Sequence, residues 1–82
     1  AVEATAVFDV ARAGLLVEEA GLKGKRIGGA EVSEVHGNFI VNRGGARAAD
    51  VLALIDFVRG EIKRRHGIEL VLELQVIGED ES

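Results

Sequence analysis

The spacing of apolar residues predicts one long helix in the second half of the chain. Apolar side chains recur at intervals of three and four within residues 46–66, which places them on one helix face: Val51, Leu54, Ile55, Val58 and Ile62. Basic side chains fill residues 63–66, where cations complement the helix dipole, and Gly67 supplies a stop signal. The four-cation run is therefore interpreted as a helix C-terminus, with phosphate binding as the alternative.

A shorter helix is predicted over residues 10–20. Ala13, Leu16, Val17 and Ala20 follow the same helical period, and Gly21 is suited to a left-handed C-terminal residue. Gly14 lies inside this stretch, where glycine costs about 1 kcal/mol relative to alanine. We interpret it as a point of close packing against another element.

Four strands are predicted from alternating or short apolar runs, at residues 2–9, 30–33 (or from residue 26), 38–42 and 68–77. The order β-α-β-β-α-β predicts an α+β two-layer sandwich, with both helices on one face of a mostly antiparallel four-stranded sheet. A ferredoxin-like strand order is the expected topology. Residues 1–78 are predicted to form one domain, and residues 79–82 an acidic, flexible tail.

Composition excludes several classes of function. With 82 residues, 48% of them hydrophobic, the chain suits one small globular domain. A net charge of −4 argues against a nucleic-acid surface, and no apolar run approaches the roughly 18 residues of a membrane span or resembles a signal peptide. Proline, cysteine, methionine, tryptophan and tyrosine are all absent, which we interpret as a mark of editing. We expect a monomer or weak homodimer that requires no partner.

The segment KGKRIGGA, residues 23–30, is the first candidate for binding chemistry. Its glycine pair and its cations suit the approach of a phosphate to backbone amides. Its spacing matches neither GxxxxGK[ST] nor GxGxxG, so we interpret it as turn glycines beside solvated cations, with phosphate binding as the alternative. Lys25 and Arg26 are the cations retained as candidate ligands.

The remaining candidates are histidine and glutamate side chains. His36 lies near Ser33 and Glu34, but nothing in the sequence supplies the orienting group and oxyanion site of a nucleophilic centre. Two histidines without cysteine predict no zinc site. Glu69 and Glu73 share a strand face and are interpreted as solvated, with an acid/base pair as the alternative.

Several longer motifs point to one family. AGLLVEEAGLKG, RIGGAEVS, HGNFIVNRGGA and the closing ELQVIG lie between Ala13 and Gly78. Together they resemble the C-terminal domain of the UDP-N-acetylenolpyruvoylglucosamine reductases (MurB). That family consists of cytoplasmic flavoenzymes that reduce an enolpyruvyl ether to UDP-N-acetylmuramate in peptidoglycan synthesis. The resemblance implies FAD and NADPH, which the family binds through domains that precede this region.

The resemblance also implies roles for individual residues. Glu73 matches the catalytic glutamate of the last strand, and His36 matches a histidine on the substrate side. In the stretch TAVFDV, however, Ala6 stands where the family has its proton-donating serine. Asp9 replaces a substrate-binding lysine and Val10 an asparagine, so the substrate site is altered as well.

These departures favour a stand-alone domain, redesigned to fold by itself, that is not an enzyme and binds no cofactor. Reduction by hydride addition needs an acid to protonate the second carbon, and a methyl group has no such proton. Two alternatives stay open. One is a weak UDP-sugar-binding module that uses Lys25, Arg26, His36 and Glu73, and the other is one part of a split reductase. The sequence does not reveal the source organism.

Overall fold

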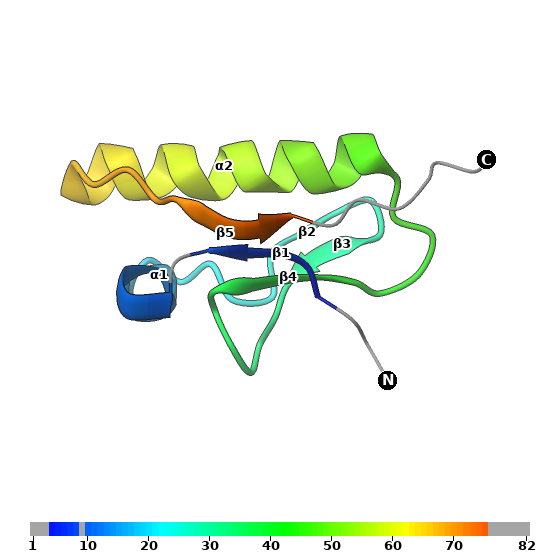
Figure 1. The fold of residues 1–82 in the computed structure, drawn as a ribbon, viewed down its shortest axis with the longest axis horizontal. Coiled ribbons are helices and arrows are strands. Elements are labelled where there is room, and N and C mark those ends of the chain that lie inside the picture. Colours follow the sequence, from blue (N-terminus) through cyan, green and yellow to red (C-terminus); the bar gives the residue numbers. More distant parts are fainter. Residues whose placement is uncertain (1–3, 9, 76–82) are drawn as a thin grey trace.

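The computed structural model describes residues 4–8 and 10–75, and shows an α+β arrangement of five strands and two helices (Figure 1). In chain order the elements are β1 (Ala4–Phe8), α1 (Val10–Glu19), β2 (Arg26–Ile27), β3 (Ala30–Val32), β4 (Phe39–Asn42), α2 (Ala48–His66) and β5 (Leu72–Gln75). The predicted α+β class is thereby confirmed. The predicted tail at residues 79–82, like the domain limit at residue 78, lies outside the described residues.

All five strands belong to one antiparallel sheet, in the order β2-β3-β4-β1-β5. Each helix therefore connects two strands that have another strand between them: α1 links β1 to the β2–β3 hairpin, and α2 links β4 to β5. If β2 is counted with β3, this is the split β-α-β arrangement of the expected ferredoxin-like order.

The sheet has a fifth strand because the stretch predicted as one strand near residues 26–33 turns back on itself. Arg26 pairs with Glu31 and Ile27 with Ala30, so Gly28 and Gly29 form the turn between β2 and β3. Gly28 has a φ of +57°, a left-handed conformation that glycine adopts without the steric penalty of a side chain. The glycine pair thus divides the predicted strand into a hairpin.

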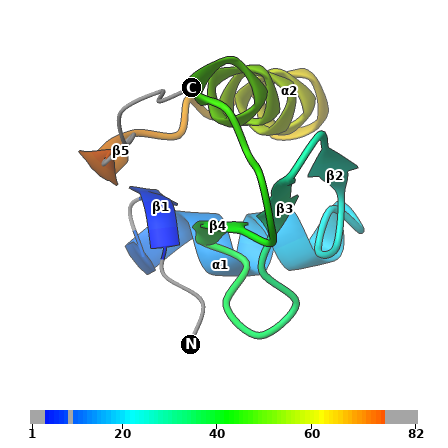
Figure 2. The same ribbon diagram turned by 90° about the vertical axis from the view of Figure 1, so that its right-hand side faces the viewer.

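The two helices occupy different places on the sheet (Figures 1 and 2). The long helix α2 runs along one face and contacts β1, β2, β3 and β4. The short helix α1 contacts α2 and lies crosswise at one end of the sheet. No described helix combines the length and the apolar character needed to cross a membrane.

One buried cluster joins both helices to the sheet. It contains Phe8 from β1, Val17 from α1, Val32 from β3, Ile40 from β4 and the apolar stripe of α2. That stripe consists of the residues predicted from the sequence: Val51, Leu54, Ile55, Val58 and Ile62. Alternation along the strands directs the intervening residues to the opposite face. Val41, for example, is buried but does not belong to this cluster.

The predicted reason for Gly14 is wrong. A Cβ at Gly14 would meet nothing within 4 Å, so its position does not require the absence of a side chain. The close approach occurs instead at Gly37, whose added Cβ would lie 3.2 Å from the carbonyl oxygen of Gly14 and 3.3 Å from Val17. The turn after β3 therefore packs onto α1 through Gly37.

Candidate functional site

A hollow lies on the sheet face opposite α2. It encloses about 490 Å³, is open to solvent, and is lined by residues of β3, β4 and the turn between them: Glu31, Ser33, Glu34, Val35, His36, Phe39, Val41 and Arg43. Phe39 and Val41 supply apolar surface, while the other side chains are mostly polar or charged. A hollow of this size is within the range that small ligands occupy.

The turn between β3 and β4 forms one wall of this hollow and is held by local hydrogen bonds. The Ser33 Oγ accepts hydrogen bonds from the backbone amides of Val35 and His36, each at 3.1 Å. The amide of Phe39 donates to the carbonyl of His36 at 2.9 Å, and the ring centroids of these two residues are 5.1 Å apart. The turn thus presents the His36 imidazole beside an aromatic ring, and Val35 remains 75% exposed.

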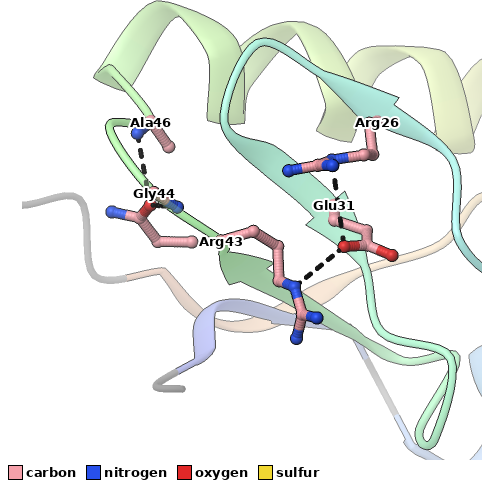
Figure 3. Close-up of polar contacts among 6 residues, drawn as sticks. Arg26, Glu31, Arg43, Gly44 and Ala46 are labelled. Carbon is pink, nitrogen blue, oxygen red and sulfur yellow. Dashed lines mark hydrogen bonds and ion pairs between the residues drawn. The ribbon is translucent and has the colours of Figure 1, made fainter. Parts of the chain in front are cut away.

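A carboxylate between two guanidinium groups lies across β2, β3 and the end of β4 (Figure 3). Glu31 Oε1 is 3.1 Å from Arg43 Nε and 3.9 Å from Arg26 Nε. The side chain of Glu31 is only 12% exposed, whereas both arginine side chains are about half exposed (56% and 48%). Arg26 and Arg43 carry two positive charges and Glu31 one negative charge, so this cluster of three side chains has a net positive charge.

The structure separates the cations that the sequence analysis grouped as candidate ligands. The Lys25 Nζ lies 4.7 Å from the centroid of the Phe57 ring of α2, in a cation–π contact. Arg26 faces Glu31, as described above. Neither residue lines the hollow, whereas His36 does. Arg43, which the sequence analysis did not single out, is the cation that shares the hollow with His36.

The Gly28–Gly29 turn packs closely against two other segments of the chain. A Cβ at Gly29 would lie 2.2 Å from the carbonyl oxygen of Gly44 and 2.6 Å from the amide nitrogen of Ala46. A Cβ at Gly28 would lie 2.3 Å from the carboxylate of Asp50. These glycines therefore serve the close packing of two loops.

Hydrogen bonds fix the loop after β4, which packs against the Gly28–Gly29 turn (Figure 3). The Asn42 Oδ1 accepts from the amides of Gly44, at 2.8 Å, and Ala46, at 3.2 Å. The amide of Arg43 donates to the carbonyl of Gly29 at 2.8 Å. The backbone of Arg43 is thereby tied to the β2–β3 turn, which positions its side chain next to Glu31.

The residues that match the family's catalytic positions lie in the first and last strands. Ala6 lies in β1, is 1% exposed and belongs to the buried cluster. Glu73 lies in β5, but its side chain is outside the described residues, as is Asp9. Glu69 binds Lys63 at 2.8 Å, and this hydrogen bond lowers the pKa of the Glu69 carboxyl. The predicted pair of Glu69 and Glu73 therefore stays untested.

Within residues 4–8 and 10–75, no three His, Asp or Glu side chains come together as potential metal ligands.

Comparison with known proteins identifies what this chain resembles. Residues 4–77 match the family model described as "UDP-N-acetylenolpyruvoylglucosamine reductase, C-terminal domain". The reductase of Heliobacterium modesticaldum is 67% identical over 67 residues, which are 82% of this chain and 21% of that protein. The Bacillus subtilis reductase is 59% identical over 66 residues, which are 80% of this chain and 22% of that protein.

A solved structure gives the same result. The crystal structure of the UDP-N-acetylenolpyruvylglucosamine reductase (MurB) from Thermus caldophilus matches with a TM-score of 0.72 and 45% sequence identity. The match covers 89% of this chain and 26% of that chain. The 82 residues thus span about a fifth to a quarter of the length of these relatives.

Proposed function

Because this chain belongs to the family of the UDP-N-acetylenolpyruvoylglucosamine reductase C-terminal domain, we propose that its 82 residues form a folded domain without reductase activity of its own. The observation that carries the proposal is Ala6. It stands at the family's serine position and packs, 1% exposed, in the core. The family's cytoplasmic location is carried over as part of the proposal.

The reduction needs a proton donor as well as a hydride donor. Reduction of an enol ether by hydride transfer leaves a carbanion-like centre that must take a proton from a positioned acid. The methyl group of Ala6 has no exchangeable proton. The hydride itself comes from a cofactor that the family holds in other domains.

We further propose that the first strand was rewritten so that the domain folds alone. Where the family reads GS-[VF]-F-K-N-P, this chain reads TAVFDV, with Ala6, Asp9 and Val10 at the positions that serve the substrate in the family. In the structure, Ala6 and Phe8 of this strand both contribute to the core. The absence of proline and cysteine agrees with a sequence chosen for ease of folding.

An assay of NADPH oxidation tests the proposal. The chain is measured alone and after mixing with the separately produced flavin domains of a relative, with UDP-N-acetylenolpyruvoylglucosamine as substrate. We expect no turnover above that of the flavin domains. Ala6→Ser is the matched variant, because it restores the hydroxyl group at one position. Turnover by the unmodified chain in the mixture would contradict the proposal and favour the split reductase.

A second candidate function is weak binding of a UDP-sugar. It is favoured by the position of His36, which lines the open hollow together with a cation. Titration with UDP-N-acetylglucosamine, followed by two-dimensional amide NMR, tests it. Saturable shifts around His36 would support binding, and an unchanged spectrum at millimolar ligand would reject it.

A further inference from the structure

The sheet face opposite α2 carries a row of apolar side chains. Val7 of β1 pairs with Phe39 of β4, and Val41 follows Phe39 on the same side of β4. Val7 and Phe39 are partly exposed, and Val41 lies outside the buried cluster. Figures 1 and 2 show α2 on the other face of the sheet and α1 crosswise at one end. An apolar sheet face of this kind favours contact with another protein surface.

The turn between β3 and β4 projects from this face, on the side away from α2 (Figures 1 and 2). Val35 lies in this turn and is 75% exposed. The two hydrogen bonds to the Ser33 Oγ hold the turn in shape, so Val35 is presented on a fixed segment. Val35, Phe39 and Val41 all line the hollow of about 490 Å³. One face thus offers both an apolar projection and a hollow with apolar lining.

The two ends of this face carry opposite charges. At the end of β4, the cluster of Arg26, Glu31 and Arg43 has a net positive charge. Before the start of β4, the turn carries Glu34, which forms no ion pair within residues 4–8 and 10–75. The length of β4, on the order of 13 Å for four residues, separates the two ends. An ion pair between Glu34 and the positive cluster therefore requires two molecules.

A second copy of the chain meets the charged ends and the apolar centre together. Two copies can place these faces against each other about a twofold axis at right angles to the strands. The start of β4 in one copy then lies over the end of β4 in the other. Each Glu34 faces the positive cluster of the partner copy, and each projecting turn lies against the partner's hollow. A twofold axis along the strands would instead place Glu34 beside Glu34, which like-charge repulsion disfavours.

We propose that the sheet face opposite α2, with Val35, Phe39 and Val41 at its centre, binds a second copy of this chain in a symmetric dimer. The strands of this face have three to five residues, so the contact covers on the order of a few hundred Å² per copy. That area is below the roughly 800 Å² per partner of a standard interface, so we expect a weak, reversible dimer. The proposal does not rest on the reductase argument, and the dimer covers the hollow that the second candidate function needs.

Sedimentation equilibrium and two-dimensional amide NMR of the 82-residue chain, from micromolar to millimolar concentration, test the proposal. We expect shifts that grow with concentration at the amides of Val35, Phe39 and Val41. Val35→Glu should raise the dissociation constant about tenfold or more, because the dimer would bury an ionised carboxylate. Leu52→Glu is the matched control, since Leu52 is exposed on α2, on the other side of the molecule. It should change the dissociation constant by less than about threefold, because solvent and salt screen a charge outside the contact.

Glu34→Lys and Arg43→Glu test the orientation of the two copies. Each variant alone should dimerise more weakly than the unmodified chain, because like charges then meet at both ends of the contact. An equimolar mixture of the two variants should recover the association, because opposite charges meet again at both ends of the mixed dimer. A dispersed amide spectrum for every variant establishes that the fold is retained.

The proposal is overturned if the chain remains monomeric up to millimolar concentration, or if Leu52→Glu weakens association as much as Val35→Glu does. It is also overturned if the mixture of Glu34→Lys and Arg43→Glu associates no better than either variant alone. Binding of UDP-N-acetylglucosamine by a chain that stays monomeric would assign the hollow to a small ligand instead. None of these results changes the NADPH assay, so the two proposals are judged separately.

Discussion

At the scale of single residues, two glycines predict opposite effects of the same substitution. An alanine at Gly29 would place its Cβ 2.2 Å from a backbone oxygen of Gly44, which no side-chain movement can relieve. An alanine at Gly60, on the exposed side of α2, would meet nothing within 4 Å. We expect Gly29→Ala to destabilise the fold by about 1–3 kcal/mol. Gly60→Ala should stabilise it by about 0.5–1 kcal/mol, because helix propensity improves.

Urea unfolding of both variants, followed by circular dichroism, measures the two free energies. Each variant serves as the other's control, since both add one methyl group to a glycine. A neutral Gly29→Ala would show that the loops around residues 28 and 44 move apart at little cost. Loss of stability in Gly60→Ala would show an unrecognised contact on the outer side of α2.

Residue positions in the candidate site were only partly predictable from the sequence. His36 was found because a motif pointed to it, and it does line the hollow. Lys25 and Arg26 are neighbours in sequence but diverge, because adjacent residues of an extended chain point to opposite sides. Arg43 was missed, although the β3–β4 register, with Glu31 opposite Val41, brings the end of β4 beside Glu31. The proximity of Arg43 and Glu31 becomes visible only once the pairing of β3 with β4 is known.

At the scale of elements, the long helix was the most predictable part of the fold. A strict apolar period gave residues 46–66, and α2 extends over Ala48–His66. The stop at Gly67 is also observed, with a φ of 70° and its amide bonded to the carbonyl of Lys63 at 2.8 Å. The last strand was predicted from residue 68 but begins at Leu72, because its partner β1 reaches no further than the Phe8–Leu72 pair. Alternating apolar and polar residues identify an extended segment. Where that segment becomes a strand depends on hydrogen bonds to a partner strand that is distant in sequence.

The apolar stripe of α2 gives a matched pair of predictions. Leu54 is fully buried in the core, while Leu52, two residues earlier, is 45% exposed. Leu54→Ala should cost about 2–5 kcal/mol, which is a large part of the stability of a domain this small. Leu52→Ala should change stability by less than about 0.5 kcal/mol. Equal effects in thermal unfolding would contradict the packing described for α2.

The end of α2 predicts a dependence on pH. The hydrogen bond from Arg64 to Glu61 lowers the pKa of that carboxyl, with a further contribution from Arg65. A carboxyl with a lowered folded-state pKa stabilises the fold above its unfolded-state pKa, about 4.3. That contribution is lost as the pH falls through the lower, folded-state value. Stability should therefore decline below about pH 5, in part through Glu61.

Glu61→Gln should flatten the dependence of the melting temperature on pH in this acidic range. In the double variant Arg64→Gln/Arg65→Gln, the pKa of Glu61 should return toward its ordinary value, as measured by NMR titration of the side-chain carboxyl. An unchanged pKa in the double variant would show that the two arginines do not hold the charge of Glu61. High salt should reproduce part of the effect, because these side chains lie at the surface.

At the scale of the whole molecule, the two sheet faces differ in kind. One is covered by α2 and contains the core, and the other carries the hollow with Arg43 and His36. The fold class followed from the periods of the sequence, because each period determines which side chains must be buried together, whereas the strand order was expected only from the order of the elements along the chain. The crosswise position of α1 did not follow from these periods, because it depends on the contact of Gly37 with the backbone of Gly14 and with Val17.

The single buried cluster predicts that the domain unfolds as one unit. Val17 of α1 and Leu54 of α2 are both fully buried in it, so α1 has no core of its own. Val17→Ala should cost about 2 kcal/mol. It should lower the free energies of amide exchange equally in both helices, because global unfolding is the route of exchange for both. If the amides of α1 exchange much faster than those of α2 in the unmodified chain, α1 opens separately, and the cluster is then two cooperative units.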